Sequence, residues 1–379
     1  MLQHKNTTII SELSNFFTSS EKAINTILGI LNSIKSLYKN FNLPKDIRAK
    51  FNSWDVVMLL ILFPMLEIKN SHNYSKSTVS HLFKCGKDVF YRLKNNEIIN
   101  WRSLCHRINF KMIRIAEEKS EIDNNTNSCL IIDDTDLPKT GYCIEFIGRI
   151  WSHVSNKSIL GFKGLFMGYY DGKSFFCLDF SLHGEKGKNE KKPQGLDKKQ
   201  AKARYSKKRN KGTAGFNRAQ EYFQAKTETM KTMIRSAVKG GIKFKYILVD
   251  SWFTSESLLR FVLSLRKGCH LLCMAKMGKS RYTYKSKELT AKEIIEDQKR
   301  KKKVRKSKLL KVWYSSVKVE YKGISIMLFF CKTTHRGKWN VLLTTNTELN
   351  FEQAYKIYST RWAIEVFFYG KHIVMQSDG

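Results

Sequence analysis

The chain contains the sequence Cys129-Leu-Ile-Ile-Asp-Asp-Thr-Asp136, an apolar run that ends in carboxylates. A short apolar run bounded by polar residues is typical of a buried strand. A second run, Phe244-Lys-Tyr-Ile-Leu-Val249, is followed in the same way by Asp250. In open α/β sheets, ligands gather outside the carboxyl ends of the strands. Both acidic positions are therefore candidate site residues.

The segments between these runs predict a mixed α/β order. Asp171-Gly172 separates two β-rich runs, 158–170 and 173–182, and such a dipeptide is a strong hairpin signal. A helix is expected over 218–238, closed by Gly240-Gly241, and another over 255–265. The order strand, hairpin, helix, strand, helix favours an α/β core.

Composition shifts along the chain predict four parts. Residues 1–123 are expected to form an all-helical domain, and 124–275 the first part of an α/β core. Residues 276–345 contain three expected strands (311–321, 324–333 and 339–344) and are predicted to form a β-rich insertion. Residues 346–379 are expected to carry the return helix of the core. The basic N-terminal helices fit two interpretations, a helix presented to a DNA groove or a bundle with solvated lysines.

The charge balance excludes an ordinary enzyme acting on small neutral substrates. The chain has 68 Lys and Arg against 33 Asp and Glu, a net charge of +35. The many positive charges on such a surface repel one another, which favours a polyanionic partner that offsets them. Nucleic acid is the leading candidate and an anionic membrane surface the second. The densest basic runs, 186–211 and 299–311, are expected to be loops or exposed rims, and the first includes Lys207, Lys208 and Arg209 as predicted DNA contacts.

The remaining composition predicts a soluble cytoplasmic protein. Eight scattered cysteines suit reduced, buried thiols, and Cys269 with Cys273 lacks the partner pair that a zinc site needs. No signal-peptide pattern opens the chain. The most apolar run, 56–66, has 11 residues and contains Pro64, whereas a spanning helix needs about 20.

The last helical segment, 358–371, places three functional groups together. On one continuous helix at about 100° per residue, Tyr358, Arg361 and Glu365 lie within an arc of about 60°. The alternative interpretation is an ordinary surface Arg–Glu pair, worth about 0.2–0.5 kcal/mol. Asp134 and Asp250, added to Glu365, would repel one another in one cleft unless a cation neutralises them. Oxygen-rich clusters suit Mg²⁺ or Mn²⁺, and two such ions about 3.5–4 Å apart can support displacement at phosphorus.

These motifs resemble those of DDE transposases of bacterial insertion sequences, in the insertion sequence 4 family. The resemblance rests on Ile-Ile-Asp-Asp134-Thr, on Tyr-Ile-Leu-Val-Asp250-Ser, and above all on Tyr-x2-Arg-x3-Glu from Tyr358 to Glu365. It spans about 124–371. It implies an RNase H-like mixed sheet with flanking helices, interrupted by a β-rich insertion and preceded by an all-helical N-terminal domain. It also implies that residues 1–123 bind DNA ends and that 124–275 form the first part of the catalytic core.

The resemblance also implies roles for individual residues. Asp134, Asp250 and Glu365 would be catalytic and bind two Mg²⁺ (or Mn²⁺) ions, with Asp133 as the alternative first aspartate. Tyr358 and Arg361 would contact phosphates near the transposon end. The implied reaction is hydrolysis that frees a 3′-hydroxyl, followed by strand transfer into target DNA. The implied partners are double-stranded terminal-repeat and target DNA, with a homodimer on the DNA and a nucleoid-associated location in a bacterial cytoplasm.

Two features depart from the family pattern. The expected lysine seven positions after Glu365 is replaced by His372, and Lys371 is the nearest lysine that could contact phosphate. The sequence also ends at Gly379, where family members continue through further helices, so a truncated and inactive copy is one interpretation. Two other functions stay open: a metal-dependent nuclease on the same fold that cuts without joining, and a non-catalytic DNA-binding protein.

Overall fold

The computed structural model describes residues 21–35, 43–44, 51–81, 84–118, 127–187, 189–265 and 268–376. The chain divides into two compact units. Unit 1 consists of Met1–Glu118, Ser206–Gln220 and Ser377–Gly379, and unit 2 consists of Lys119–Tyr205 and Glu221–Gln376. The segment 206–220 therefore leaves the core sequence to join the N-terminal helices.

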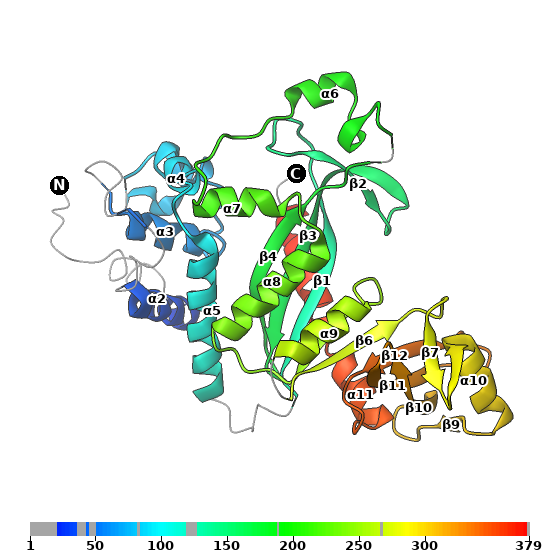
Figure 1. Ribbon diagram of the computed structural model, residues 1–379. Helices are drawn as coiled ribbons and strands as arrows, with labels where there is room; N and C mark the ends of the chain where they lie inside the picture. Colours follow the sequence, from blue (N-terminus) through cyan, green and yellow to red (C-terminus); the bar gives the residue numbers. More distant parts are fainter. Residues whose placement is uncertain are drawn as a thin grey trace. The chain divides into compact units, whose positions relative to one another are not determined.

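Unit 1 is helical throughout its described part (Figure 1). Its helices are α2 (Glu21–Lys35), α3 (Ser53–Leu62), η2 (Asn73–Lys76), η3 (Thr78–His81), α4 (Lys87–Lys94), α5 (Trp101–Glu118) and α7 (Ala214–Glu221). The most apolar run of the sequence, 56–66, lies in α3 and the turn after it, and most of α3 is buried. Asn52 caps α3 by accepting a hydrogen bond from the backbone N–H of Trp54 at 2.8 Å.

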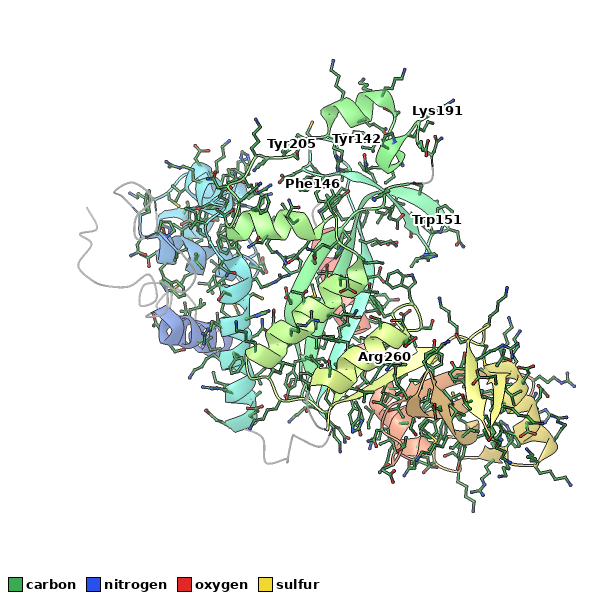
Figure 2. All side chains as sticks on the ribbon, in the orientation of Figure 1. Tyr142, Phe146, Trp151, Lys191, Tyr205 and Arg260 are labelled. Carbon is green, nitrogen blue, oxygen red and sulfur yellow. The ribbon has the colours of Figure 1, made fainter. Side chains whose placement is uncertain are left out.

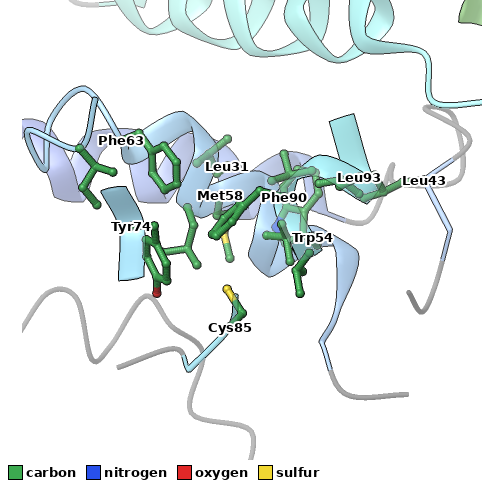
Figure 3. Close-up of a cluster of buried hydrophobic side chains, with 14 of the residues drawn as sticks. Leu31, Leu43, Trp54, Met58, Phe63, Tyr74, Cys85, Phe90 and Leu93 are labelled. Atoms are coloured by element: carbon green, nitrogen blue, oxygen red, sulfur yellow. The ribbon is translucent and has the colours of Figure 1, made fainter. Parts of the chain in front are cut away.

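Aromatic side chains hold the core of unit 1 together. Phe63, Tyr74 and Phe90 contact one another with ring centroids 5.0 to 5.8 Å apart, and α2 adds Leu31 to the same cluster (Figure 3). Such ring pairs add about 0.5–1.5 kcal/mol beyond the burial of their apolar surface. This core fixes the turns that precede and follow α4.

Unit 2 is built on a mixed sheet. Its first strands are β1 (Cys129–Pro138), β2 (Gly148–Ser152), β3 (Lys157–Tyr170), β4 (Phe175–His183), β5 (Tyr246–Val249) and β6 (His270–Ala275). β1 pairs antiparallel with β3 and parallel with β5, β5 pairs parallel with β6, and β4 pairs antiparallel with β3. The hairpin predicted at Asp171-Gly172 joins β3 and β4, which confirms that prediction.

Helices cover both faces of this part of the sheet. The described helices of unit 2 outside the insertion are η4 (Pro193–Gly195), α6 (Lys198–Ala203), α8 (Lys226–Lys239), α9 (Glu256–Leu265), α11 (Phe351–Ser359) and α12 (Trp362–Gln376), and of these α8, α9, α11 and α12 pack on the strands. In Figure 1, α8 and α9 lie on one face of the strands and α12 on the other. The single helix expected over 218–238 is instead two, α7 and α8, separated by residues 222–225.

The β-rich insertion extends the same sheet. It contains β7 (Arg281–Tyr284), β8 (Lys287–Thr290), α10 (Ala291–Arg300), β9 (Arg305–Lys306), β10 (Trp313–Tyr321), β11 (Ile324–Lys332) and β12 (Asn340–Thr344). β12 pairs antiparallel with β6, so the strand order continues through β6-β12-β11-β10-β7-β8. The three strands predicted here are present.

The architecture confirms the expected mixed α/β class, with a mixed sheet, flanking helices, a β-rich insertion and an N-terminal helical part. Within the described ranges, no helix combines the length and hydrophobicity needed to cross a bilayer. None of the eight cysteines forms a disulfide, and Cys269 and Cys273 are both buried.

Candidate active site

The alternation of side chains in two neighbouring strands places two aspartates on one face of the sheet. Cys129 and Ile131 of β1 belong to the hydrophobic cluster that packs against α11 and α12. Because successive side chains point to opposite faces, Asp133 continues this phase. Tyr246 and Leu248 of β5 belong to the same cluster, and Asp250 continues theirs.

The register brings these two aspartates level. Ile131 lies opposite Leu248 in the parallel β1–β5 pair. Two residues further along each strand, the same register places Asp133 beside Asp250. Both carboxylates therefore stand at the carboxyl ends of adjacent parallel strands, where α/β sheets bind their ligands.

Arg361 links this edge of the sheet to α12. Its Nη1 donates to Asp133 Oδ2 at 2.6 Å, and its Nη2 donates to Glu365 Oε1. The side chains of Asp133, Arg361 and Glu365 are 15 %, 19 % and 25 % exposed. The Arg361–Glu365 contact is thus part of a half-buried three-residue cluster, and it is more than a surface helix pair.

The electrostatic environment of Asp133 reflects crowding of negative charge. Burial raises the pKa of its carboxyl group to about 6, and the charges of Asp250 and Asp134 act in the same direction. Arg361 and the backbone N–H of Asp134 oppose the shift. A buried carboxylate with like charges beside it favours a bound proton or a cation.

The segment that carries Tyr358, Arg361 and Glu365 is broken, and the prediction of one continuous helix was wrong. α11 ends at Ser359 and α12 begins at Trp362, and the backbone N–H of Arg361 donates to Tyr358 O at 3.0 Å, an i to i−3 bond. The hydroxyl of Thr360 donates to Ile357 O at 2.7 Å and so competes with regular helix bonds. The tight turn still keeps the Arg361 guanidinium 5.9 Å from the Tyr358 ring centroid.

Tyr358 is anchored beneath the aspartates. Its hydroxyl donates to the carbonyl oxygen of Val249, directly before Asp250, at 3.4 Å. Burial raises the pKa of this phenol well above its usual value, and the neighbouring acids act in the same direction. The phenol is therefore neutral at physiological pH.

Asp134 lies on the opposite face of β1, in phase with Leu130 and Ile132. Its Oδ2 accepts a hydrogen bond from Lys226 Nζ of α8 at 2.5 Å. The same Nζ lies 4.0 Å from the ring centroid of Trp252, which is 49 % exposed. The backbone N–H of Trp252 donates to Asp250 Oδ1 at 2.8 Å. The structure thus joins Asp133 and Glu365 through Arg361 and sets Asp250 level with Asp133, whereas Asp134 forms a second ion pair on the other face of β1.

The other predicted DNA contacts lie elsewhere. Lys371 is in α12, but its side chain is outside the described part of the structure. Lys207, Lys208 and Arg209 belong to the segment that joins unit 1. Lys226 and Trp252 were not predicted as site residues from the sequence. Trp252 could have been, because it lies only two positions after Asp250.

The atoms that the carboxylate side chains of this site offer are of the type that a hard divalent cation binds. Asp133, Asp250 and Glu365 offer only oxygen atoms, from a half-buried and negatively crowded position. In the arrangement described, the Arg361 guanidinium occupies the place between two of these carboxylates. Among the residues that the structure describes, no three His, Cys, Asp or Glu side chains stand close enough together to hold a metal. A cation at this site therefore requires Arg361 to change partners.

Comparison with known proteins gives one family match. Residues 95–276, just under half of the chain, match the family model described as DDE superfamily endonuclease. This supports the broader part of the resemblance, a DDE superfamily endonuclease domain. The match includes Asp133, Asp134 and Asp250 and ends before Glu365.

Among solved structures, the chain is similar to the cryo-EM structure of a piggyBac transposase synaptic complex with hairpin DNA. The sequence identity is 13 % and the TM-score is 0.39, over 95 % of this chain and 67 % of that one. No curated protein matches the sequence.

Proposed function

We propose that the chain is a DNA transposase that cuts the ends of a mobile element and joins them to target DNA. The observation that carries the proposal is that Arg361 joins Asp133 to Glu365 at the carboxyl end of β1, where the strand register sets Asp250 beside Asp133. The DDE superfamily match over 95–276 and the net charge of +35 support it.

In this proposal, three carboxylates hold the catalytic cations. DDE superfamily nucleases use divalent metals, and we propose Mg²⁺ or Mn²⁺, with two ions, for this chain. The ligands would be Asp250, Glu365 and one of the adjacent pair Asp133 and Asp134. The geometry favours Asp133, and the resemblance assigns Asp134. When bound, such cations polarise phosphate oxygens and activate water or a hydroxyl group for displacement at phosphorus.

The chain's own residues orient the substrate. Once a cation neutralises the carboxylates, the guanidinium of Arg361 is free to pair with a phosphate, for which its planar fork is suited. Tyr358 would contact a phosphate near the DNA end by turning its O–H from the carbonyl oxygen of Val249 to a phosphate oxygen. Lys371 would add a charge from α12, and Lys207, Lys208 and Arg209 would bind the backbone of double-stranded DNA. Assembly as a homodimer on two DNA ends belongs to the same proposal.

The first test is cleavage of supercoiled plasmid by the purified full chain. We expect Mn²⁺- or Mg²⁺-dependent nicking that Asp250→Asn abolishes, with DNA binding unchanged or tighter because a negative charge near phosphate is removed. Binding lost together with cleavage would instead point to a folding defect, which circular dichroism would reveal. Cleavage retained by Asp250→Asn would contradict the proposed site.

A second assay separates a transposase from a plain nuclease. Labelled duplexes that carry the inverted repeats flanking the gene are incubated with target plasmid and Mn²⁺. A transposase yields products in which the label is covalently joined to the plasmid. Cleaved duplex without joined product would support a nuclease, and binding without either product would support a non-catalytic DNA-binding protein.

A further inference from the structure

The core donates a basic segment to unit 1. The chain leaves unit 2 after Tyr205, labelled in Figure 2, and returns to it at Glu221. The intervening residues 206–220 contain five Lys and Arg and no acidic residue. Residues 84–97, which hold α4 and its flanking turns, contain four Lys and Arg and two acidic residues.

One carboxylate joins these two basic segments. Glu97, just after α4, accepts a hydrogen bond from Asn210 Nδ2 at 2.9 Å, and its carboxylate oxygens also accept from the Asn210 backbone N–H at 3.3 Å. The backbone N–H of Gly215 donates to Glu97 O at 2.8 Å. Lys207 Nζ donates to Asn95 Oδ1 at 2.9 Å, so the contact continues along the turn.

The junction is close-packed, and the donated segment has its own local structure. A Cβ added at Gly215 would lie 2.9 Å from Glu97 Cβ, nearer than real Cβ contacts allow. The hydroxyl of Thr213 donates to Asn210 O at 2.8 Å and accepts from Phe216 N–H at 3.2 Å, which caps α7. The turn that presents Lys207 to Lys211 is therefore held at both of its ends.

Bringing two positive segments together costs electrostatic free energy unless a polyanion offsets it. Lys87, Arg92 and Lys94 of α4 are exposed, as are Lys207, Lys208 and Lys211. The carboxylate of Glu97 holds the amide and the backbone of Asn210, in the middle of the second basic segment. The arrangement fixes where these basic side chains lie and leaves them open to solvent.

We propose that α4 and the segment 207–211 form one composite surface for the DNA backbone, and that Glu97 is the residue that positions its second half. This inference rests on the proposed function and makes it more specific. It assigns to an acidic residue a role that strengthens binding to a polyanion.

The direction in which Glu97→Gln changes DNA affinity tests the proposal. Binding of the full chain to a fluorescein-labelled duplex of 30 base pairs is measured by anisotropy at several KCl concentrations. If Glu97 acts only through its charge, Glu97→Gln binds more tightly and with a steeper salt dependence. If Glu97 positions the segment, Glu97→Gln binds several-fold more weakly, and the slope of log K against log salt falls by about 0.9 for each phosphate that the protein no longer neutralises. Tighter or unchanged binding overturns the inference.

Two further variants exclude simple misfolding. Gly215→Ala changes no charge but disturbs the packing against Glu97, so it is expected to weaken binding. Gly29→Ala, on the exposed face of α2 where an added Cβ meets nothing within 4 Å, serves as the matched control and should bind like the wild type. Thermal melts and the fluorescence of the buried Trp54 report whether the unit 1 core is intact.

A double-mutant cycle makes the test specific. In a background of Lys207→Gln, Lys208→Gln, Arg209→Gln and Lys211→Gln, Glu97→Gln has no basic segment left to position and should no longer weaken binding. A reduction of equal size in both backgrounds would contradict the positioning role. If the wild type does not bind the duplex at all, the proposed function fails together with this inference, whereas binding by the wild type with the opposite sign for Glu97→Gln refutes the inference alone.

Discussion

Asp133 and Asp134 are consecutive residues of β1, yet their carboxylates pair with cationic side chains on opposite faces of the sheet. Asp133 pairs with Arg361 beside α12, and Asp134 pairs with Lys226 of α8. One residue of register therefore decides which carboxylate stands with Asp250 and Glu365. The two aspartates form a matched pair for experiment, because they share the same strand and the same chemistry.

We expect Asp133→Asn to reduce plasmid cleavage to background and Asp134→Asn to reduce it less. The reason is that Asp133 is level with Asp250 and shares a guanidinium with Glu365, whereas Asp134 faces Lys226. Both variants should retain DNA binding. Initial nicking rates in Mn²⁺ provide the comparison. A larger reduction of the nicking rate in Asp134→Asn than in Asp133→Asn would show that Asp134 is the first catalytic aspartate, as the family resemblance implies.

Divalent cations should stabilise the folded chain. A ligand that binds only the native state at 100 times its Kd adds about 2.7 kcal/mol. For unit 2 this predicts a rise in Tm of several degrees when Mn²⁺ is added to EDTA-treated protein. Asp250→Asn should remove most of the rise. An equal rise in that variant would place the cation elsewhere on the chain.

Arg361→Ala should make the protein less stable without metal and more responsive to it. The substitution leaves Asp133 and Glu365 without their shared cation, which for partly exposed groups costs about 1–3 kcal/mol. An added divalent cation then replaces the missing charge without competing against the guanidinium. The difference in Tm between EDTA and Mn²⁺ is therefore expected to be larger in Arg361→Ala than in the wild type. A smaller difference would mean that Arg361 assists the metal site and does not compete with it.

Four strands of the core, β1, β3, β4 and β5, could be predicted because each contains an apolar run with a clear boundary, whereas β2 and β6 were not predicted. Cys129 to Ile132 is entirely buried, as is β5, and an acidic residue closes each run. The phase of the alternation was also available in the sequence. Counting from Cys129 and from Tyr246 in steps of two reaches Asp133 and Asp250, whereas Asp134 was preferred from the family pattern.

Other features left weaker signals or none. The break at Thr360 is hidden because Tyr358, Arg361 and Glu365 keep helical spacing across a tight turn. α10 was not predicted, although its N-terminus has the sequence of a capping box, formed by Thr290 and Glu293. The next residue, Ile294, is buried. That residues 206–220 belong to unit 1 could not be predicted. A run of lysines indicates an exposed segment but does not indicate which part of the chain it packs against.

The last prediction concerns acid sensitivity. His183 of β4 is buried, with Nδ1 3.2 Å from Gln224 O, and its Nε2 has no hydrogen-bond partner among the described residues. Burial lowers its pKa below the ordinary value of about 6.5, so between the two pKa values the unfolded chain binds more protons than the folded one. Stability from this source is complete above pH 6.5 and is lost as the pH falls through the folded pKa.

We therefore expect the urea midpoint in EDTA to fall between pH 7.5 and 5.5. His183→Gln should reduce the fall, while the exposed His153→Gln serves as the control and should not. The pKa of the half-buried His270 is also lowered, mainly by desolvation, so part of the fall should persist in His183→Gln. Asp133 acts in the opposite direction, because its raised pKa favours the folded state as the pH drops through about 6. The comparison is cleanest in an Asp133→Asn background, where an unchanged fall after His183→Gln would show that His183 is not the group that titrates.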